Sequence, residues 1–230
     1  MGHHILPGTP PVELTLRRSA RARRISLRVS RLDGRVTLTL PRGVREGEAL
    51  DFARTKQDWL RTQLAARPDG VSIAPGVEIP VEGRLLRIVS GTGRRIALDG
   101  DKVMVPGPAD AAGTRLQAWL KTLARDRLAR ASDRHAQALG RPYNRITLRD
   151  TRSRWGSCSS NGGLMYSWRL VMAPPDVLDY VAAHEVAHLE EMNHSPAFWA
   201  VVARLCPGYE TPRHWLRAQG TDLHRYRFEG

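Results

Sequence analysis

The sequence is poor in cysteine, in lysine and in long apolar runs, and each shortage excludes a class of protein. The two cysteines, Cys158 and Cys206, lie far apart and outside any Cys-x-x-Cys pair, so we expect reduced thiols rather than a disulfide framework. No apolar run approaches the roughly 18 residues that cross a bilayer, which excludes a transmembrane helix. The first residues resemble no secretory signal. We therefore expect a cytoplasmic protein without membrane association.

Lysine is scarce because arginine replaces it. Only 3 of the 36 basic residues are lysine, and the net charge is +13. Ten arginines and a single acid, Asp33, lie between Arg17 and Arg45, which predicts a basic N-terminal face. Such a face attracts polyanions, so nucleic acid is a possible partner. An arginine bias can equally reflect the base composition of a genome, and the sequence leaves both interpretations open.

The first half of the chain predicts an N-terminal basic α+β subdomain over residues 1–108. Alternating apolar and polar residues flank an Asp-Gly pair, which is typical of a β-hairpin. The elements expected here are a loose tail around residues 7–11, hairpin strands over 25–29 and 36–40, a helix over 48–66, and a small antiparallel meander over 71–105.

The second half, residues 109–230, predicts a separate domain that begins after the Pro-Gly-Pro segment at 106–108. An apolar stripe at helical spacing indicates a long helix over 111–139. Two strands, 146–148 and 163–170, are expected to pair around a Gly/Ser-rich turn. Helices are expected from 174 to about 191 and over 196–205, so the fold class is α+β.

The segment His184-Glu185-Val186-Ala187-His188 carries the chemistry. Residues four apart on a helix leave the same face, so the imidazoles of His184 and His188 can share one metal ion. Glu185 points about 100° round the helix, where a carboxylate can take a proton from the attacking water. The alternative is that core hydrogen bonds satisfy both histidines.

His194 is the third candidate ligand. It lies ten residues after His184, a distance at which the chain can fold back and present another imidazole. The long zinc motif has a glycine at the intervening turn, where this sequence has Glu191. Asn193 is expected to supply a left-handed turn residue instead.

The residues around this helix resemble the YgjP-like metallopeptidase family, which is related to the SprT and WLM groups of zinc peptidases. The resemblance extends over about residues 17–216. It is carried by the segments Arg154–Ser159, Trp168–Leu170, Ala173–Pro174, His184–Leu189, Met192–Ser195 and Phe198–Trp199.

The resemblance implies a zincin-like half, in which a long helix and a small antiparallel sheet support the metal-binding helix. It implies a zinc-dependent hydrolase acting on peptides or proteins, with His184, His188 and His194 as metal ligands and Glu185 as general base. One zinc ion is expected, although histidine ligation admits other divalent transition metals. We expect the strand over 163–170 to be the sheet edge that borders the cleft.

Two alternatives remain open at the level of sequence. One is a nucleotide phosphohydrolase of the pyrophosphatase type, since the same site could attack phosphorus. The other is a protease tethered to DNA through the basic N-terminal face. The sequence does not indicate an oligomeric state.

Several other residues have assigned roles. Asp179 and Glu190 are candidates to accept hydrogen bonds from metal-binding imidazoles. Trp155 and Trp168 are expected to brace the sheet, and His135 is expected to be a hydrogen-bonded core residue.

Overall fold

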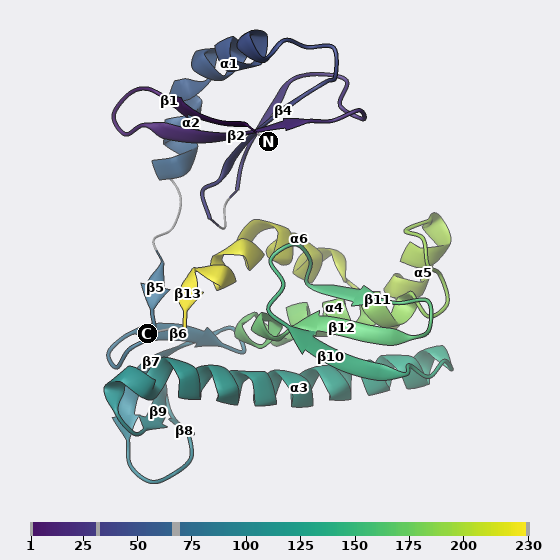
Figure 1. The fold of residues 1–230 in the computed structure, drawn as a ribbon. Coiled ribbons are helices and arrows are strands. Elements are labelled where there is room, and N and C mark those ends of the chain that lie inside the picture. Colours follow the sequence, from purple (N-terminus) through teal and green to yellow (C-terminus); the bar gives the residue numbers. More distant parts are fainter. Residues whose placement is uncertain (1, 31–32, 66–69, 229–230) are drawn as a thin grey trace. The chain divides into compact units, whose positions relative to one another are not determined.

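The computed structural model describes residues 2–30, 33–65 and 70–228 (Figure 1). The chain forms two compact units, an N-terminal unit of residues 1–69 and a C-terminal unit of residues 70–230. The sequence predicted the boundary at 108 instead. Residues 71–108 belong to the C-terminal unit because Ile79, Ile88 and Val103 share one buried cluster with the helices that follow. Within the described residues, no helix is long and apolar enough to cross a membrane.

The N-terminal unit is one four-stranded sheet with two helices. Apolar side chains on one face of the sheet, including Leu14 and Leu38, are fully buried with Ala53 and Leu60 of the helices. The strand order is β1-β2-β4-β3, and β2 and β4 run parallel. The elements are β1 (Gly2–Leu6), β2 (Val12–Arg18), β3 (Ser26–Val29), β4 (Val36–Leu40), α1 (Glu46–Thr55) and α2 (Gln57–Ala65).

The predicted hairpin is confirmed, since β3 and β4 pair antiparallel. The prediction of a loose tail around residues 7–11 is wrong. These residues connect β1 to β2, and the two strands pair with Leu6 and Val12 buried. The expected helix over 48–66 is two helices that meet at Lys56, and residue 66 lies outside the described residues.

The first part of the C-terminal unit is a four-stranded sheet with order β6-β7-β9-β8. The predicted antiparallel meander is partly wrong, because β7 and β9 run parallel. A short strand, β5, pairs instead with β13 at the end of the chain. The elements are β5 (Val71–Ser72), β6 (Glu78–Val81), β7 (Arg84–Gly91), β8 (Ala97–Asp99), β9 (Lys102–Pro106) and the 3₁₀ turn η1 (Ala109–Ala111).

The long helix α3 (Ala112–Leu139) is confirmed, and Gly140 ends it in a left-handed conformation (φ 73°) that glycine adopts without strain. A three-stranded sheet follows, consisting of β10 (Arg145–Arg149), β11 (Gly156–Cys158) and β12 (Gly163–Ser167). Figure 1 shows α3 running along the whole C-terminal unit, near β9 at one end and β10 at the other.

The three-stranded sheet corrects two expectations. It is mixed rather than antiparallel, because β10 pairs parallel to β12 and β11 pairs antiparallel to it. The strand predicted to border the cleft, β12, is central in the order β10-β12-β11. The edge strand next to the metal-site helix is therefore β11, which contacts α4 (Pro175–Ala187).

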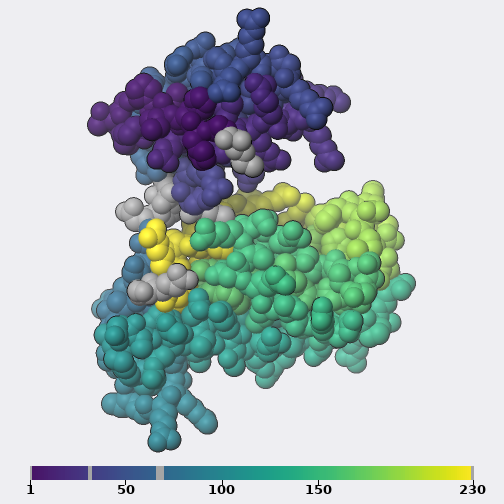
Figure 2. All heavy atoms as spheres, in the orientation of Figure 1, coloured from purple at the N-terminus to yellow at the C-terminus, as the bar shows by residue number. Residues whose placement is uncertain are grey.

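The last part of the chain is more ordered than the sequence indicated. Helix α5 (Pro196–Leu205) is confirmed, and Ser195 caps it by accepting a hydrogen bond from the amide of Phe198. The remaining elements are the 3₁₀ segment η2 (Trp168–Met172), α6 (Glu210–Gln219), the 3₁₀ segment η3 (Gly220–Arg225) and β13 (Tyr226–Arg227). The C-terminal residues, yellow in Figure 2, lie on the body of this unit, where Phe228 is buried.

Candidate metal centre

Helix α4 positions the first two histidines. Pro174 precedes the helix and Pro175 is its first residue. Proline suits this position because the first amide of a helix has no partner within the helix, and proline has no amide hydrogen to leave unpaired. Nine of its 13 residues are buried, so the helix is held on several sides and its orientation is fixed by packing. His184 leaves the last full turn, and His188 is the residue at which the helix ends.

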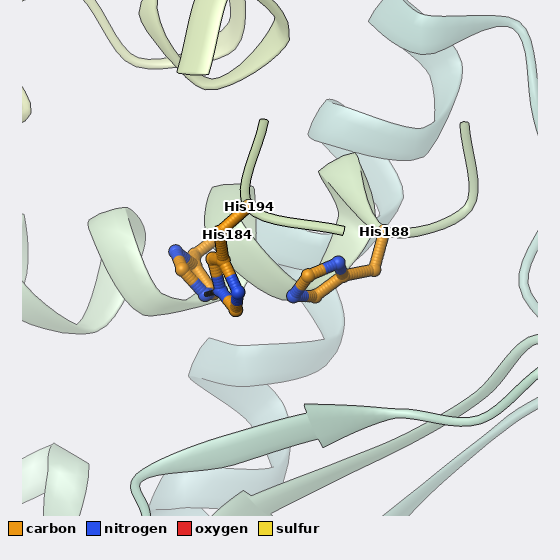
Figure 3. A group of neighbouring side chains, drawn as sticks. All are labelled: His184, His188 and His194. Atoms are coloured by element: carbon orange, nitrogen blue, oxygen red, sulfur yellow. Dashed lines mark hydrogen bonds between the residues drawn. The ribbon is translucent and has the colours of Figure 1, made fainter. Parts of the chain in front are cut away.

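Three imidazoles converge at this end of α4. Each of His184, His188 and His194 offers a ring nitrogen, and these atoms all lie within 4.8 Å of one another. Figure 3 shows the three rings turned toward a common point. The Nε2 atoms of His184 and His194 are 3.1 Å apart. Two nitrogens on a tetrahedral zinc ion are separated by about 3.3 Å when each Zn–N distance is near 2.0–2.1 Å, so the spacing fits a metal.

The hydrogen bonds leave the right atoms free for a metal. Nδ1 of His188 lies 2.9 Å from the carbonyl oxygen of Glu191, to which it donates, so the lone pair of that ring is on Nε2. In His184 it is Nε2 that faces His194, and the other ring nitrogen, Nδ1, is buried and has no partner among the described residues. The three-histidine set is therefore chemically suited to a divalent transition metal.

Burial also favours the neutral form of these histidines. It lowers the pKa of His184 to about 3, with contributions from the other two histidines and from Arg213. Burial lowers the pKa of His188 as well, although its hydrogen bond to Glu191 opposes this. Neutral imidazole is the form that binds a metal, so both rings are competent ligands near pH 7.

Glu185 follows His184 on α4, and its carboxyl is buried. Its exposed fraction is 5%, and burial raises its pKa to about 8, with the nearby charge of Arg154 opposing the rise. Strand β11 approaches it closely at Gly156. A Cβ atom at Gly156 would lie 2.5–2.7 Å from Oε1, Cγ and Cδ of Glu185, so only glycine leaves room for this carboxyl.

The turn to His194 differs from the expectation. Among the described residues other than glycine, Glu82 is the only one with a positive φ, so Asn193 is not a left-handed turn residue. The chain turns instead through tight backbone hydrogen bonds at the end of α4, where the amides of Glu190 and Glu191 donate to the carbonyl of Ala187.

The prediction that Asp179 and Glu190 accept hydrogen bonds from the metal-binding imidazoles is also wrong. Asp179 accepts hydrogen bonds from Arg134 and His135, and Glu190 pairs with Arg141 and Arg204. The partner of His188 is a backbone carbonyl, which no side-chain pattern can indicate. The prediction for His135 is confirmed, since it is buried and hydrogen-bonded.

A row of stacked side chains beside the site was not foreseen. Tyr180 stacks on Tyr209 at 6.2 Å, Tyr209 stacks on Trp199 at 5.4 Å, and the guanidinium of Arg213 lies 4.1 Å from the Trp199 ring centroid. The Trp199 ring is 5.7 Å from that of His184. Tyr180, Trp199 and Arg213 belong to three different helices, and Tyr209 directly precedes the third of them. Their proximity depends on packing that sequence spacing does not reveal.

The two tryptophans expected to brace the sheet differ from each other. Trp168 is fully buried, as expected, whereas Trp155 is half-buried and packs against His224.

Comparison with known proteins decides the family. The sequence model described as the YgjP-like metallopeptidase domain matches residues 23–219. The chain belongs to the YgjP-like metallopeptidase family. As a YgjP-like metallopeptidase it is a metal-dependent hydrolase of peptide or protein substrates, and it uses a divalent metal.

Two further comparisons add little to this YgjP-like assignment. The crystal structure of the metallopeptidase zymogen of Pyrococcus abyssi abylysin is similar at 20% identity, with 40% of this chain and 95% of that chain covered and a TM-score of 0.36. A comparison with curated proteins finds no match.

Proposed function

We propose that this chain is a zinc-dependent peptidase in which His184, His188 and His194 hold the metal and Glu185 is the general base. The observation that carries the proposal is the convergence of three ring nitrogens within 4.8 Å, at the end of a helix in which the residue after His184 is the almost fully buried Glu185. A zinc ion bound by the imidazoles supplies Lewis-acid polarisation of the scissile carbonyl and acidifies water.

Glu185 carries out the proton transfers in this proposal. The ionised carboxylate takes a proton from the attacking water and delivers it to the leaving amine, which is the role of a general acid–base. Burial raises the pKa of Glu185 and disfavours this form, whereas a cation held by the histidines would favour it. Strand β11 covers one side of the Glu185 carboxyl and keeps bulk water away from it. The carboxyl is therefore not surrounded by solvent that could exchange protons with it.

Strand β11 is the proposed binding strand for the substrate. It is an edge of the three-stranded sheet and contacts α4, so the main-chain groups on its outer side are available for pairing. An extended peptide that pairs with such an edge is held by backbone hydrogen bonds, largely independently of its sequence. Pairing with β11 would bring the peptide alongside Glu185.

Replacement of Gly156 by alanine tests the placement of Glu185. The added methyl group must displace the carboxyl, and a displacement of about 1 Å costs roughly 100-fold in turnover. We expect kcat on a peptide substrate to fall by about that factor while zinc content stays unchanged, because the three atoms nearest to the added Cβ all belong to Glu185. Gly47→Ala is the matched control, since a Cβ there meets nothing within 4 Å. Unchanged kcat in Gly156→Ala would contradict the placement.

Contact with nucleic acid stays a prediction. Arg17, Arg21, Arg24 and Arg28 of the N-terminal unit are exposed, which supports an interaction with polyanions. Nothing in the geometry of the metal centre depends on it.

A further inference from the structure

Some arginines of the C-terminal unit form ion pairs and others do not. On α3, for example, Arg127, Arg130 and Arg134 pair with Glu82, Asp126 or Asp179. Arg115 and Arg125 of the same helix pair with no carboxylate among the described residues, and neither do Arg154 and Arg213. Arg154 and Arg213 differ from the other unpaired arginines in lying close to the candidate catalytic groups.

Arg213 is held next to the metal centre by stacking. Its guanidinium lies 4.1 Å from the centroid of Trp199, whose ring is 5.7 Å from that of His184 and 5.9 Å from that of His194. Trp199 is itself fixed by the parallel ring of Tyr209. Stacking of this kind orients the guanidinium plane and leaves its N–H groups free to bind a ligand.

Arg154 lies near Glu185, close enough for its charge to act on that carboxyl. It is exposed and comes two residues before Gly156, the position at which β11 meets the Glu185 carboxyl. Its backbone is fixed, because the carbonyl of Arg154 accepts a hydrogen bond of 2.8 Å from the hydroxyl of Thr151. One guanidinium without an ion-pair partner therefore lies near Glu185, just before β11, and a second lies on α6 next to the ring that contacts His184.

We propose that Arg154 and Arg213 select peptides that carry carboxylate side chains near the cleaved bond. An arginine that lacks a partner in the protein gains most from a carboxylate supplied by the ligand, because the pair can form two parallel hydrogen bonds. Two such arginines around a cleft also attract acidic chains and repel basic ones. This inference rests on the proposed peptidase function and names its substrate class.

The test compares two quenched fluorescent peptide mixtures of equal length, one with glutamate and one with glutamine around randomised central residues. Zinc-loaded protein is expected to cleave the glutamate mixture with a kcat/KM at least about tenfold higher, the effect of one charge-assisted hydrogen bond. Added salt is expected to shrink the difference. Equal cleavage of the two mixtures, or faster cleavage of the glutamine mixture, would overturn the inference and leave the peptidase function standing.

Variants assign the preference to the two residues. Arg154→Gln and Arg213→Gln are each expected to lose most of it, and Arg213→Glu is expected to favour a lysine mixture instead. Arg95→Gln is the matched control, because Arg95 is exposed on the loop between β7 and β8 and its loss changes the net charge equally. A preference that survives both glutamine substitutions would overturn the assignment.

A binding measurement separates this inference from the reaction itself. In zinc-loaded Glu185→Gln protein, fluorescence anisotropy is expected to show tighter binding of a labelled glutamate peptide than of its glutamine counterpart. Equal affinities would overturn the inference without reference to turnover. Failure of the wild type to cleave any peptide, together with phosphate release from a nucleoside triphosphate, would overturn the proposed function and this inference together.

Discussion

Glu185→Gln is expected to lower kcat by about 100- to 10,000-fold, the usual contribution of a general base. Glutamine has nearly the same shape as glutamate and cannot accept the proton of the attacking water. The ring nitrogens of the three histidines are untouched, so the zinc content is expected to match that of the wild type. Cleavage of the glutamate peptide mixture and elemental analysis of the same sample measure both quantities.

Glu190→Gln is the matched control for this change. Glu190 follows the same helix, but its carboxylate faces Arg141 and Arg204 at 3.6 Å on the surface. Exposed pairs of this kind contribute little, so we expect kcat to stay within about twofold of the wild type. Turnover retained by Glu185→Gln would exclude the proposed mechanism, even with zinc in place.

Arg169→Met is expected to cause the largest loss of stability in the C-terminal unit. The exposed fraction of Arg169 is 7%, and its guanidinium forms two hydrogen bonds with Asp150, at 2.7 and 3.0 Å. It also donates to the carbonyls of Leu223 and Tyr226, which ties the last residues of the chain to the sheet. The side chain of Asp150 is 40% exposed, so water replaces its lost partner, but the two backbone carbonyls lose a buried donor, and the expected cost is about 1–3 kcal/mol.

Urea unfolding followed by circular dichroism measures this loss. Arg127→Met is the comparison: Arg127 also pairs with two acids, but it is more than one-third exposed, so its removal is expected to cost less than about 1 kcal/mol. Equal midpoints for the two variants would contradict the role assigned to Arg169.

The effect of Arg169 has a defined pH dependence. Burial raises the pKa of Asp150, but the hydrogen bonds and charge of Arg169 outweigh it, so the pKa lies below its ordinary value. A carboxyl with a lowered pKa in the folded state stabilises the protein above the unfolded pKa of about 3.9. The difference between wild type and Arg169→Met is therefore expected to be full at pH 7 and to shrink as the pH falls below about 4.

Local patterns predicted α3, α4 and α5 and the grouping of the three histidines. The four-residue spacing of His184 and His188 specifies one helix face, and the apolar stripe specifies α3, because both depend on a single helical period. The predicted domain boundary at residue 108 lies too far along the chain, because Pro106–Pro108 suggests a linker. The buried residues before it, such as Val103 and Val105, belong to the same core as the helix that follows.

Features that depend on tertiary packing could not be predicted from the sequence. The edge strand beside α4 is β11 rather than β12. The residue pattern within a single strand does not indicate its place in the sheet, so this order could not be predicted. Gly156 was visible as a glycine in a strand, which often marks the close approach of another group. The stack of Arg213 on Trp199 joins α6 to α5 and carries no local signal.

The most direct test of the account is the zinc content of wild-type protein beside His188→Ala, measured by elemental analysis after zinc is offered and excess is removed. Loss of one of three ligands at a four-coordinate site is expected to reduce about one equivalent of zinc to near zero. Circular dichroism of both proteins controls for folding. Equal zinc in the two proteins, or none in the wild type, would contradict the three-histidine centre on which the proposed function rests.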